Sequence, residues 1–116
     1  MASDLRFVEY VCEQAGHEPA LSHRKMFGEY ALYMQGKVVG LVCDNLLFVK
    51  PTLQGKAVLG ATTERPPYPG AKPHFQVAEE LEDRELMQRL FRATALALPP
   101  PRPKSRKPAT RPVQSR

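Results

Sequence analysis

Three short apolar segments, separated from one another by only two or three polar residues, constrain the fold of this chain most. The segments are residues 30–34, 38–43 and 46–50, and the connections are Gln35-Gly36 and Asp44-Asn45. Both dipeptides suit tight hairpin turns. Strands joined this closely run antiparallel, because a parallel pairing needs a crossover of a dozen or more residues. The sequence therefore predicts a three-stranded β-meander.

The middle segment is apolar on both of its predicted faces. Successive side chains of a strand point to opposite faces, and the two sets here are Val38, Gly40 and Val42, and Val39, Leu41 and Cys43. One layer of helices covers only one face of a sheet, which leaves the other face open to a contact between two copies of the chain.

Helical periodicity precedes and follows the meander. Ser3 is the predicted N-cap of a first helix that stops at Gly16, and acidic residues 79–83 lie at the positive end of a last helix that stops before Pro99. The apolar stripes of these helices are Leu5, Val8, Val11, Cys12 and Ala15, and Leu86, Met87, Leu90, Phe91, Thr94 and Leu98.

The segment between the meander and the last helix holds shorter elements. Residues 52–59 form a predicted short helix capped by Thr52 and ended by Gly60, whose inward side chains are Leu53, Ala57 and Val58. The proline-rich run 65–70 suits a sheet edge or a turn, and residues 74–77 suit a last short strand. The predicted fold is a two-layer α+β domain, an antiparallel sheet with helices in the order α-β3-α-β2-α.

Charge divides the chain into two parts. The whole sequence has seventeen basic and twelve acidic residues, a net charge of +5. Residues 99–116 contain no acid, and their six bases are Arg102, Lys104, Arg106, Lys107, Arg111 and Arg116. Residues 1–98 therefore carry about −1. We expect a domain over 1–98 and a disordered or polyproline-like tail over 99–116, because the tail is rich in proline and poor in apolar residues.

The basic tail has three interpretations. Its six bases suit weak, non-specific binding to nucleic acid, because contacts with phosphates carry almost no sequence information. The tail is otherwise a solubilising end, or residues 99–103 dock in a reader of polyproline segments.

The remaining chemistry-bearing residues point to no enzyme and no cofactor. His17, His23 and His74 match no metal-binding spacing, and Cys43 lacks a base positioned to activate it. Cys12 and Cys43 suit buried thiols in a reducing compartment. No segment resembles a signal peptide or reaches the ~20 apolar residues of a membrane span, so we expect a cytoplasmic protein that binds no membrane.

Several motifs resemble the TfoX (Sxy) N-terminal domain family of bacterial competence regulators. Residues 25–33 are similar to the family's "RMFGGYGLY" opening, residues 47–50 to its "LYLK" strand, and residues 75–81 to its "YEVPEEL" entry into the last helix. The resemblance spans residues 3–98. The motif positions singled out here are Met26, Phe27, Gly28, Tyr30, Tyr33, Gly36, Lys37, Lys50, Tyr68, Pro69 and Gly70.

The resemblance implies a non-enzymatic regulatory module that binds proteins and is linked to transcription. Competence regulators of this family act with the cyclic-AMP receptor protein at promoters, so the implied partner is a transcription regulator. Full-length members carry a second, helical domain, and the tail stands where that domain would begin. Glu29 stands where the family often has glycine, and Ala78 where it often has proline. The alternatives are nucleic-acid binding through the tail and a small-ligand binder or unrecognised enzyme, which would need a deep pocket.

Two motif positions have competing explanations. Lys50, at the end of an apolar strand, suits contact with an anion or a partner, but it equally suits a sheet edge protected against further strand pairing. Residues 26–28 suit either an exposed ligand hinge or an aromatic residue packed in the core beside a flexible glycine.

Overall fold

The structure, a computed structural model, describes residues 3–17, 20–26 and 28–100. Within these ranges an antiparallel sheet has the strand order β1-β2-β3-β4-β6-β5. The elements, in chain order, are α1 (Leu5–Ala15), β1 (Leu21–Met26), β2 (Glu29–Met34), β3 (Lys37–Cys43), β4 (Leu46–Val49), α2 (Leu53–Leu59), β5 (Glu64–Arg65), β6 (His74–Val77), the 3-10 helix η1 (Glu79–Glu82) and α3 (Arg84–Ala97).

The predicted meander is confirmed as β2, β3 and β4. Gln35 and Gly36 have φ angles of 56° and 78°, and Asp44 and Asn45 have φ angles of 54° and 57°. Positive φ at both central residues is the type I′ geometry, whose twist matches that of the flanking strands. The two dipeptides therefore set the register of the sheet.

The predicted order α-β3-α-β2-α is wrong by one strand, because β1 precedes the meander and pairs with β2. Its sequence, Leu-Ser-His-Arg-Lys-Met, buries only Leu21 and exposes the other five residues. An edge strand open to water needs no alternation of apolar and polar residues, so the pattern gave no signal.

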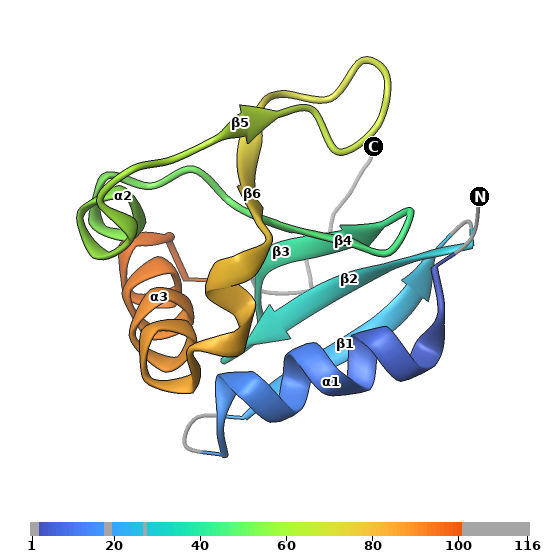
Figure 1. The fold of residues 1–116 in the computed structure, drawn as a ribbon, viewed down its shortest axis with the longest axis horizontal. Coiled ribbons are helices and arrows are strands. Elements are labelled where there is room, and N and C mark those ends of the chain that lie inside the picture. The colour runs from blue at the N-terminus through green and yellow to red at the C-terminus, as the bar shows by residue number, and fades with distance from the viewer. Residues whose placement is uncertain (1–2, 18–19, 27, 101–116) are drawn as a thin grey trace, which may run out of the picture.

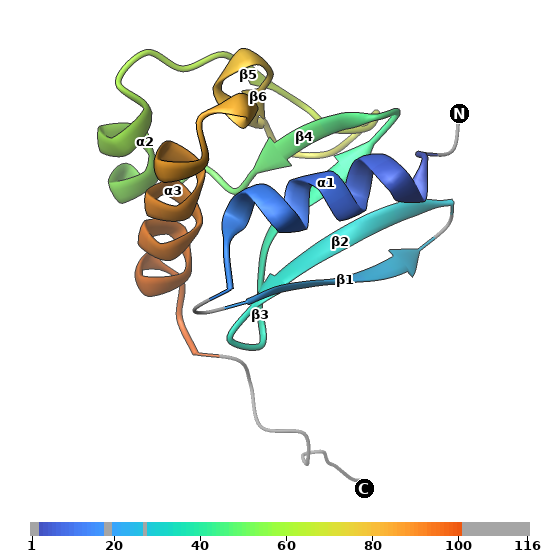
Figure 2. The same cartoon turned by 60° about the horizontal axis from the view of Figure 1, so that its bottom comes forward.

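The core lies between one face of the sheet and the helices α1 and α3, as Figures 1 and 2 show. This confirms the two-layer α+β class. We call this covered face of the sheet the inner face and the opposite one the outer face. The core includes Val8, Val11 and Ala15 of α1, Leu32, Met34, Val39, Val42, Leu47, Val49, Phe75 and Val77 of the sheet, and Met87, Leu90, Phe91 and Ala95 of α3.

A β-bulge changes the alternation expected for the middle strand. Leu32 pairs with Gly40 but Tyr33 pairs with Val38, so Val39 is an extra residue in β3. Val39 and Val42 are consequently both buried in the core, although a regular strand would point them to opposite faces. A Cβ atom on Gly40 would lie 2.5 Å from the Phe48 carbonyl oxygen, so the strands approach closely only because this residue is glycine.

The predicted cap of the first helix is wrong. Asp4 is the N-cap, and its side chain accepts a hydrogen bond from the Arg6 amide at 2.9 Å. Gly16 ends the helix as predicted. In the last helical segment, residues 79–82, which include three glutamates, form η1, and Asp83 then caps α3 by accepting from the Leu86 amide at 3.1 Å.

The short helix α2 has the predicted cap, Thr52, and the predicted end, Gly60. Its predicted inward face is right for Val58, which packs against the core, and wrong for Leu53, which is 83% exposed, and for Ala57, which is exposed too. Gly55 lies beside α3 as well, where an added Cβ would lie 3.2 Å from Oγ1 of Thr94. The two helices approach closely at this point because the residue is glycine.

Two sets of predicted residues lie outside the described part of the chain. They are Phe27 and the six basic residues of the tail. Of the tail, Pro99 and Pro100 are described, and both are exposed. No helix in the described ranges is long and apolar enough to cross a membrane.

Candidate functional site

The outer face of the sheet carries a row of paired residues that includes buried apolar side chains. Arg24 pairs with Ala31, Ala31 with Leu41, Leu41 with Phe48, and Phe48 with Gln76. Ala31 and Phe48 are only 1% and 2% exposed, although α1 and α3 cover the other face. The outer face is therefore a second apolar surface, as the composition of the middle strand predicted.

A groove lies at one end of this outer face, where the connection between β5 and β6 approaches the sheet. Its volume is about 630 Å³ and its lining is mostly apolar. Figure 1 shows the connection extending well beyond β5 and β6 toward the end of the sheet where β3 and β4 join. We call it the outer-face groove, and its lining residues are Met26, Glu29, Tyr30, Leu41, Cys43, Asp44, Pro67, Tyr68 and Pro69.

The two rims of the groove hold its most exposed apolar side chains. Met26, at the end of β1, is 41% exposed, and Tyr68 is 56% exposed. Pro67 beside Tyr68 is buried, and the Ala71 amide donates to the Tyr68 carbonyl at 3.1 Å. This turn, with φ of 89° at Gly70, holds Tyr68 at the groove.

Glu29 connects three segments at the acidic end of the groove. Its carboxylate accepts from the Ser3 hydroxyl at 2.5 Å and from the Asp44 amide at 3.2 Å. The Ser3 hydroxyl in turn accepts from the Asn45 amide at 3.0 Å, and the Asn45 side-chain oxygen accepts from the Asp4 amide at 2.7 Å. Ser3, the predicted helix cap, therefore serves to fix the start of α1 to the β3–β4 turn.

The thiol of Cys43 lies in the groove but is not an activated nucleophile. Burial, with a smaller contribution from the Glu29 carboxylate, raises its pKa to about 11. The thiol therefore stays protonated at neutral pH, and the thiolate is the reactive form. Burial and the nearby Glu9 carboxylate also raise the pKa of Cys12. Both cysteines are free thiols.

The structure brings some of the predicted motif residues together and separates others. Met26, Tyr68 and Pro69 line the outer-face groove, although more than 40 residues separate Met26 from Tyr68. Tyr30 also borders the groove, but its side chain belongs to the core of the inner face. The exposure of Met26 favours the surface interpretation of that residue over the core one. Of the motif glycines, Gly28, Gly36 and Gly70 have positive φ.

Three motif residues have other roles. Tyr33 lies beneath the Arg24 guanidinium, which is 5.9 Å from the ring centroid. Lys37 donates from Nζ to the Ala95 carbonyl at 2.7 Å, near the end of α3. Lys50 follows β4, which lies between β3 and β6, so protection of a sheet edge does not explain it. Its amide donates to the Val39 carbonyl at 2.9 Å.

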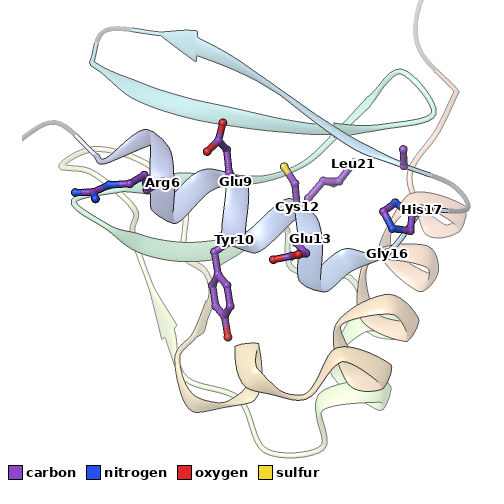
Figure 3. A pocket seen from close by; sticks show the side chains of 9 residues that line it. Arg6, Glu9, Tyr10, Cys12, Glu13, Gly16, His17 and Leu21 are labelled. Carbon is purple, nitrogen blue, oxygen red and sulfur yellow. The ribbon is translucent and has the colours of Figure 1, made fainter.

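A second hollow of about 600 Å³ lies along α1 and β1, and it is open to solvent. Figure 3 shows that Arg6 and Tyr10 point away from His17 rather than toward a common centre. Convergent polar groups are the mark of a binding or catalytic site, and this hollow lacks them. No group of three or more His, Cys, Asp or Glu side chains in the described ranges is arranged to hold a metal ion.

Sequence reasoning missed Leu41, Pro67 and the linking role of Glu29. Leu41 and Pro67 had no distinguishing signal, because an apolar strand residue and a loop proline are common. The departure from the family's usual glycine at residue 29 was a usable signal: a carboxylate at the start of a strand can accept hydrogen bonds that a glycine cannot.

The fold and the groove define a small two-layer α+β domain with an apolar site on an open sheet face. The chain belongs to the TfoX N-terminal domain family, whose model matches residues 13–98. This family is not known as an enzyme family. A relative from Spirochaeta aurantia, the "Uncharacterized 12.7 kDa protein in trpE 5'region", is 41% identical over 110 residues, which are 95% of this chain and 96% of the relative.

Proposed function

We propose that this protein is a regulatory module that binds another protein through the outer-face groove and acts in the control of transcription. The observation that carries the proposal is the groove itself, where Met26, Tyr68 and Pro69, motif residues from two distant segments, meet on an apolar surface. Family membership supports the regulatory role.

The chemistry of the groove favours an apolar side chain of a partner protein as its occupant. The Glu29 carboxylate already accepts hydrogen bonds from Ser3 and from the Asp44 amide. The Cys43 thiol keeps its proton because its pKa is raised to about 11. The groups of the groove that remain free to contact a partner are Met26, Leu41 and the aromatic ring of Tyr68. These side chains suit contact with aliphatic or aromatic groups.

Capture of partners by the tagged full chain tests this proposal. A double variant, Met26→Ser with Tyr68→Ser, removes both exposed rims of the groove without touching the core. The matched control is Leu96→Ser, because Leu96 is 72% exposed but lies on α3. We expect a partner with a role in transcription to be retained by the native chain and the control and lost by the double variant.

Equal capture by all three proteins would contradict the use of the groove, and a partner unconnected with transcription would contradict the regulatory role. Circular dichroism and the melting temperature of each variant show whether a loss of capture reflects binding rather than unfolding.

The charge of the tail supports a second candidate function. Residues 99–116 carry six bases and no acid, whereas residues 1–98 are nearly neutral. Non-specific nucleic-acid binding would therefore be a property of the tail and independent of the groove. Binding of a protein at the groove therefore does not depend on whether the tail also binds nucleic acid.

A further inference from the structure

Strand β1 is a long, open edge of the sheet. It comes first in the strand order, and it has six residues, whereas β5 at the other edge has two. An open edge presents unpaired N–H and C=O groups to which an extended segment of another chain can add.

The register identifies which groups of β1 are unpaired. Met34 and Lys37 close a two-residue turn, so the N–H and C=O of Met34 point toward β3. Leu21 lies opposite Met34 on the other side of β2, and its own groups therefore point away from the sheet. The alternation then repeats, so Leu21, His23 and Lys25 offer hydrogen-bonding groups to a new strand.

The side chains of β1 indicate which segment would fit. Arg24 and Lys25 are both exposed and basic. Arg24 belongs to the outer face, where its guanidinium lies over Tyr33. Lys25 belongs to the inner face, where Figure 3 shows Glu9 of α1 directed toward the strands. Among the described residues neither Arg24 nor Lys25 forms an ion pair, but only Arg24 shares its face with Met26, which forms the near rim of the groove.

We propose that β1 is the pairing edge for an extended segment of a partner protein, with an acidic residue opposite Arg24 and an apolar residue opposite Met26. This inference rests on the proposed function, because it names the form and chemistry of the partner that reaches the outer-face groove. Opposite charges across neighbouring strands stabilise the pairing, whereas like charges destabilise it.

The same charges disfavour the two other occupants of this edge. Antiparallel pairing of β1 with a second copy of itself would bring Arg24 and Lys25 close to the same basic residues of the other copy. A nucleic-acid strand would need its basic contacts on one surface, but Arg24 and Lys25 lie on opposite faces of the sheet.

The probe for this inference is the peptide Thr-Val-Glu-Glu-Val-Thr, which reads the same in both directions and so fits parallel or antiparallel pairing. It is titrated into the isotopically labelled full chain while amide chemical shifts are recorded. We expect the shifts to centre on Leu21, His23 and Lys25. The control peptide, with both glutamates replaced by lysine, should produce no such shifts.

Substitutions in β1 separate strand pairing from simple charge attraction. We expect Arg24→Glu to weaken binding by about tenfold and Lys25→Glu to weaken it less. His23→Pro deletes one outward N–H and leaves the bonds of Ser22 and Arg24 to β2 in place, so it should also weaken binding by about tenfold. The matched His23→Ala keeps that N–H and should stay within about twofold of the native chain.

Three results would overturn the inference: shifts confined to residues 99–116, equal binding by His23→Pro and His23→Ala, or tighter binding of a DNA duplex than of the peptide at this edge. A partner whose capture survives Arg24→Glu and His23→Pro but is lost by the groove double variant would leave the proposed function standing and overturn the pairing edge alone.

Discussion

At the residue scale, Glu29 shows how a single side chain at the edge of a site organises its surroundings. Its carboxylate holds the segment before α1 and the β3–β4 turn together through Ser3 and Asp44. Hydrogen bonds to an ionised group are stronger than those between neutral groups. The position of the acidic end of the groove therefore depends on this one carboxylate.

Replacing Glu29 with alanine should lower the free energy of unfolding by about 1–2 kcal/mol, because two donors, the Ser3 hydroxyl and the Asp44 amide, lose a charged acceptor in a partly exposed site. Chemical denaturation measures the change. Glu79→Ala, at an exposed position of η1, is the control and should stay within about 0.5 kcal/mol. Equal effects of the two variants would show that the hydrogen bonds of Glu29 contribute nothing to stability.

Cys43 should react slowly with iodoacetamide in the folded protein. Its pKa is raised from 9.0 to about 11, so below pH 9 its thiolate fraction is about 100-fold smaller than that of the unfolded thiol. As the pH rises from 9 toward 11, the unfolded thiol ionises first, so this group also lowers the stability of the folded state in that window.

Mass spectrometry of peptides from timed reactions, at pH values from 8 to 11, measures the rate at Cys43. The guanidinium-unfolded chain provides the reference rate at each pH. Rates at Cys43 that match the unfolded reference at pH 8 would contradict the protonated, buried thiol.

At the scale of elements, the bulge in β3 decides which apolar residues become core. Because Val39 is an extra residue, the strand presents both Val39 and Val42 to the helices and directs Lys37 to the end of α3. A regular strand would place one of these valines on the outer face. Because of the bulge, Val39 and Val42 both belong to the core, while Leu41 and Cys43 line the groove on the outer face.

The contact between β3 and β4 beside the bulge should not tolerate a larger residue. Gly40→Ala places a Cβ atom 2.5 Å from the Phe48 carbonyl oxygen, and a backbone atom cannot move aside cheaply. We expect a loss of about 2–3 kcal/mol in unfolding free energy. Ser22→Ala, at an exposed position of β1, is the control, and thermal or urea unfolding compares the two. An unchanged stability of the Gly40 variant would contradict the close approach of the strands.

At the scale of the whole molecule, charge and structure are separated along the chain. The domain holds the core, the groove and the matched family region, and it is nearly neutral over residues 1–98. The excess of positive charge belongs to residues 99–116. Binding to protein and binding to polyanions are therefore expected from different parts of the chain.

Any affinity of the full chain for DNA should disappear when residues 99–116 are deleted. If all six basic residues neutralise phosphates, the logarithm of the binding constant should fall with the logarithm of salt concentration at a slope of about −5. Fluorescence anisotropy with a labelled duplex across a salt series measures this slope. Binding that persists in the shortened chain would place the contact on the domain instead.

The sequence by itself determined the meander, the helices at its two ends and the family, because these depend on local signals. Gln35-Gly36 and Asp44-Asn45 fit type I′ turns whatever surrounds them, and the stripe of α3 repeats at helical spacing. The sequence also showed that the middle strand is apolar on both faces, from which a contact between two copies of the chain stays a prediction.

Only the tertiary structure decided the rest. Strand β1 has no apolar alternation because it pairs on one side only. The exposure of Leu53 follows from the packing of α2 on α3. The groove exists because the loop of Tyr68 returns to the end of the sheet near Met26 and Leu41. These features depend on contacts between residues far apart in the chain, and local pattern carries no information about which distant segment will be the neighbour.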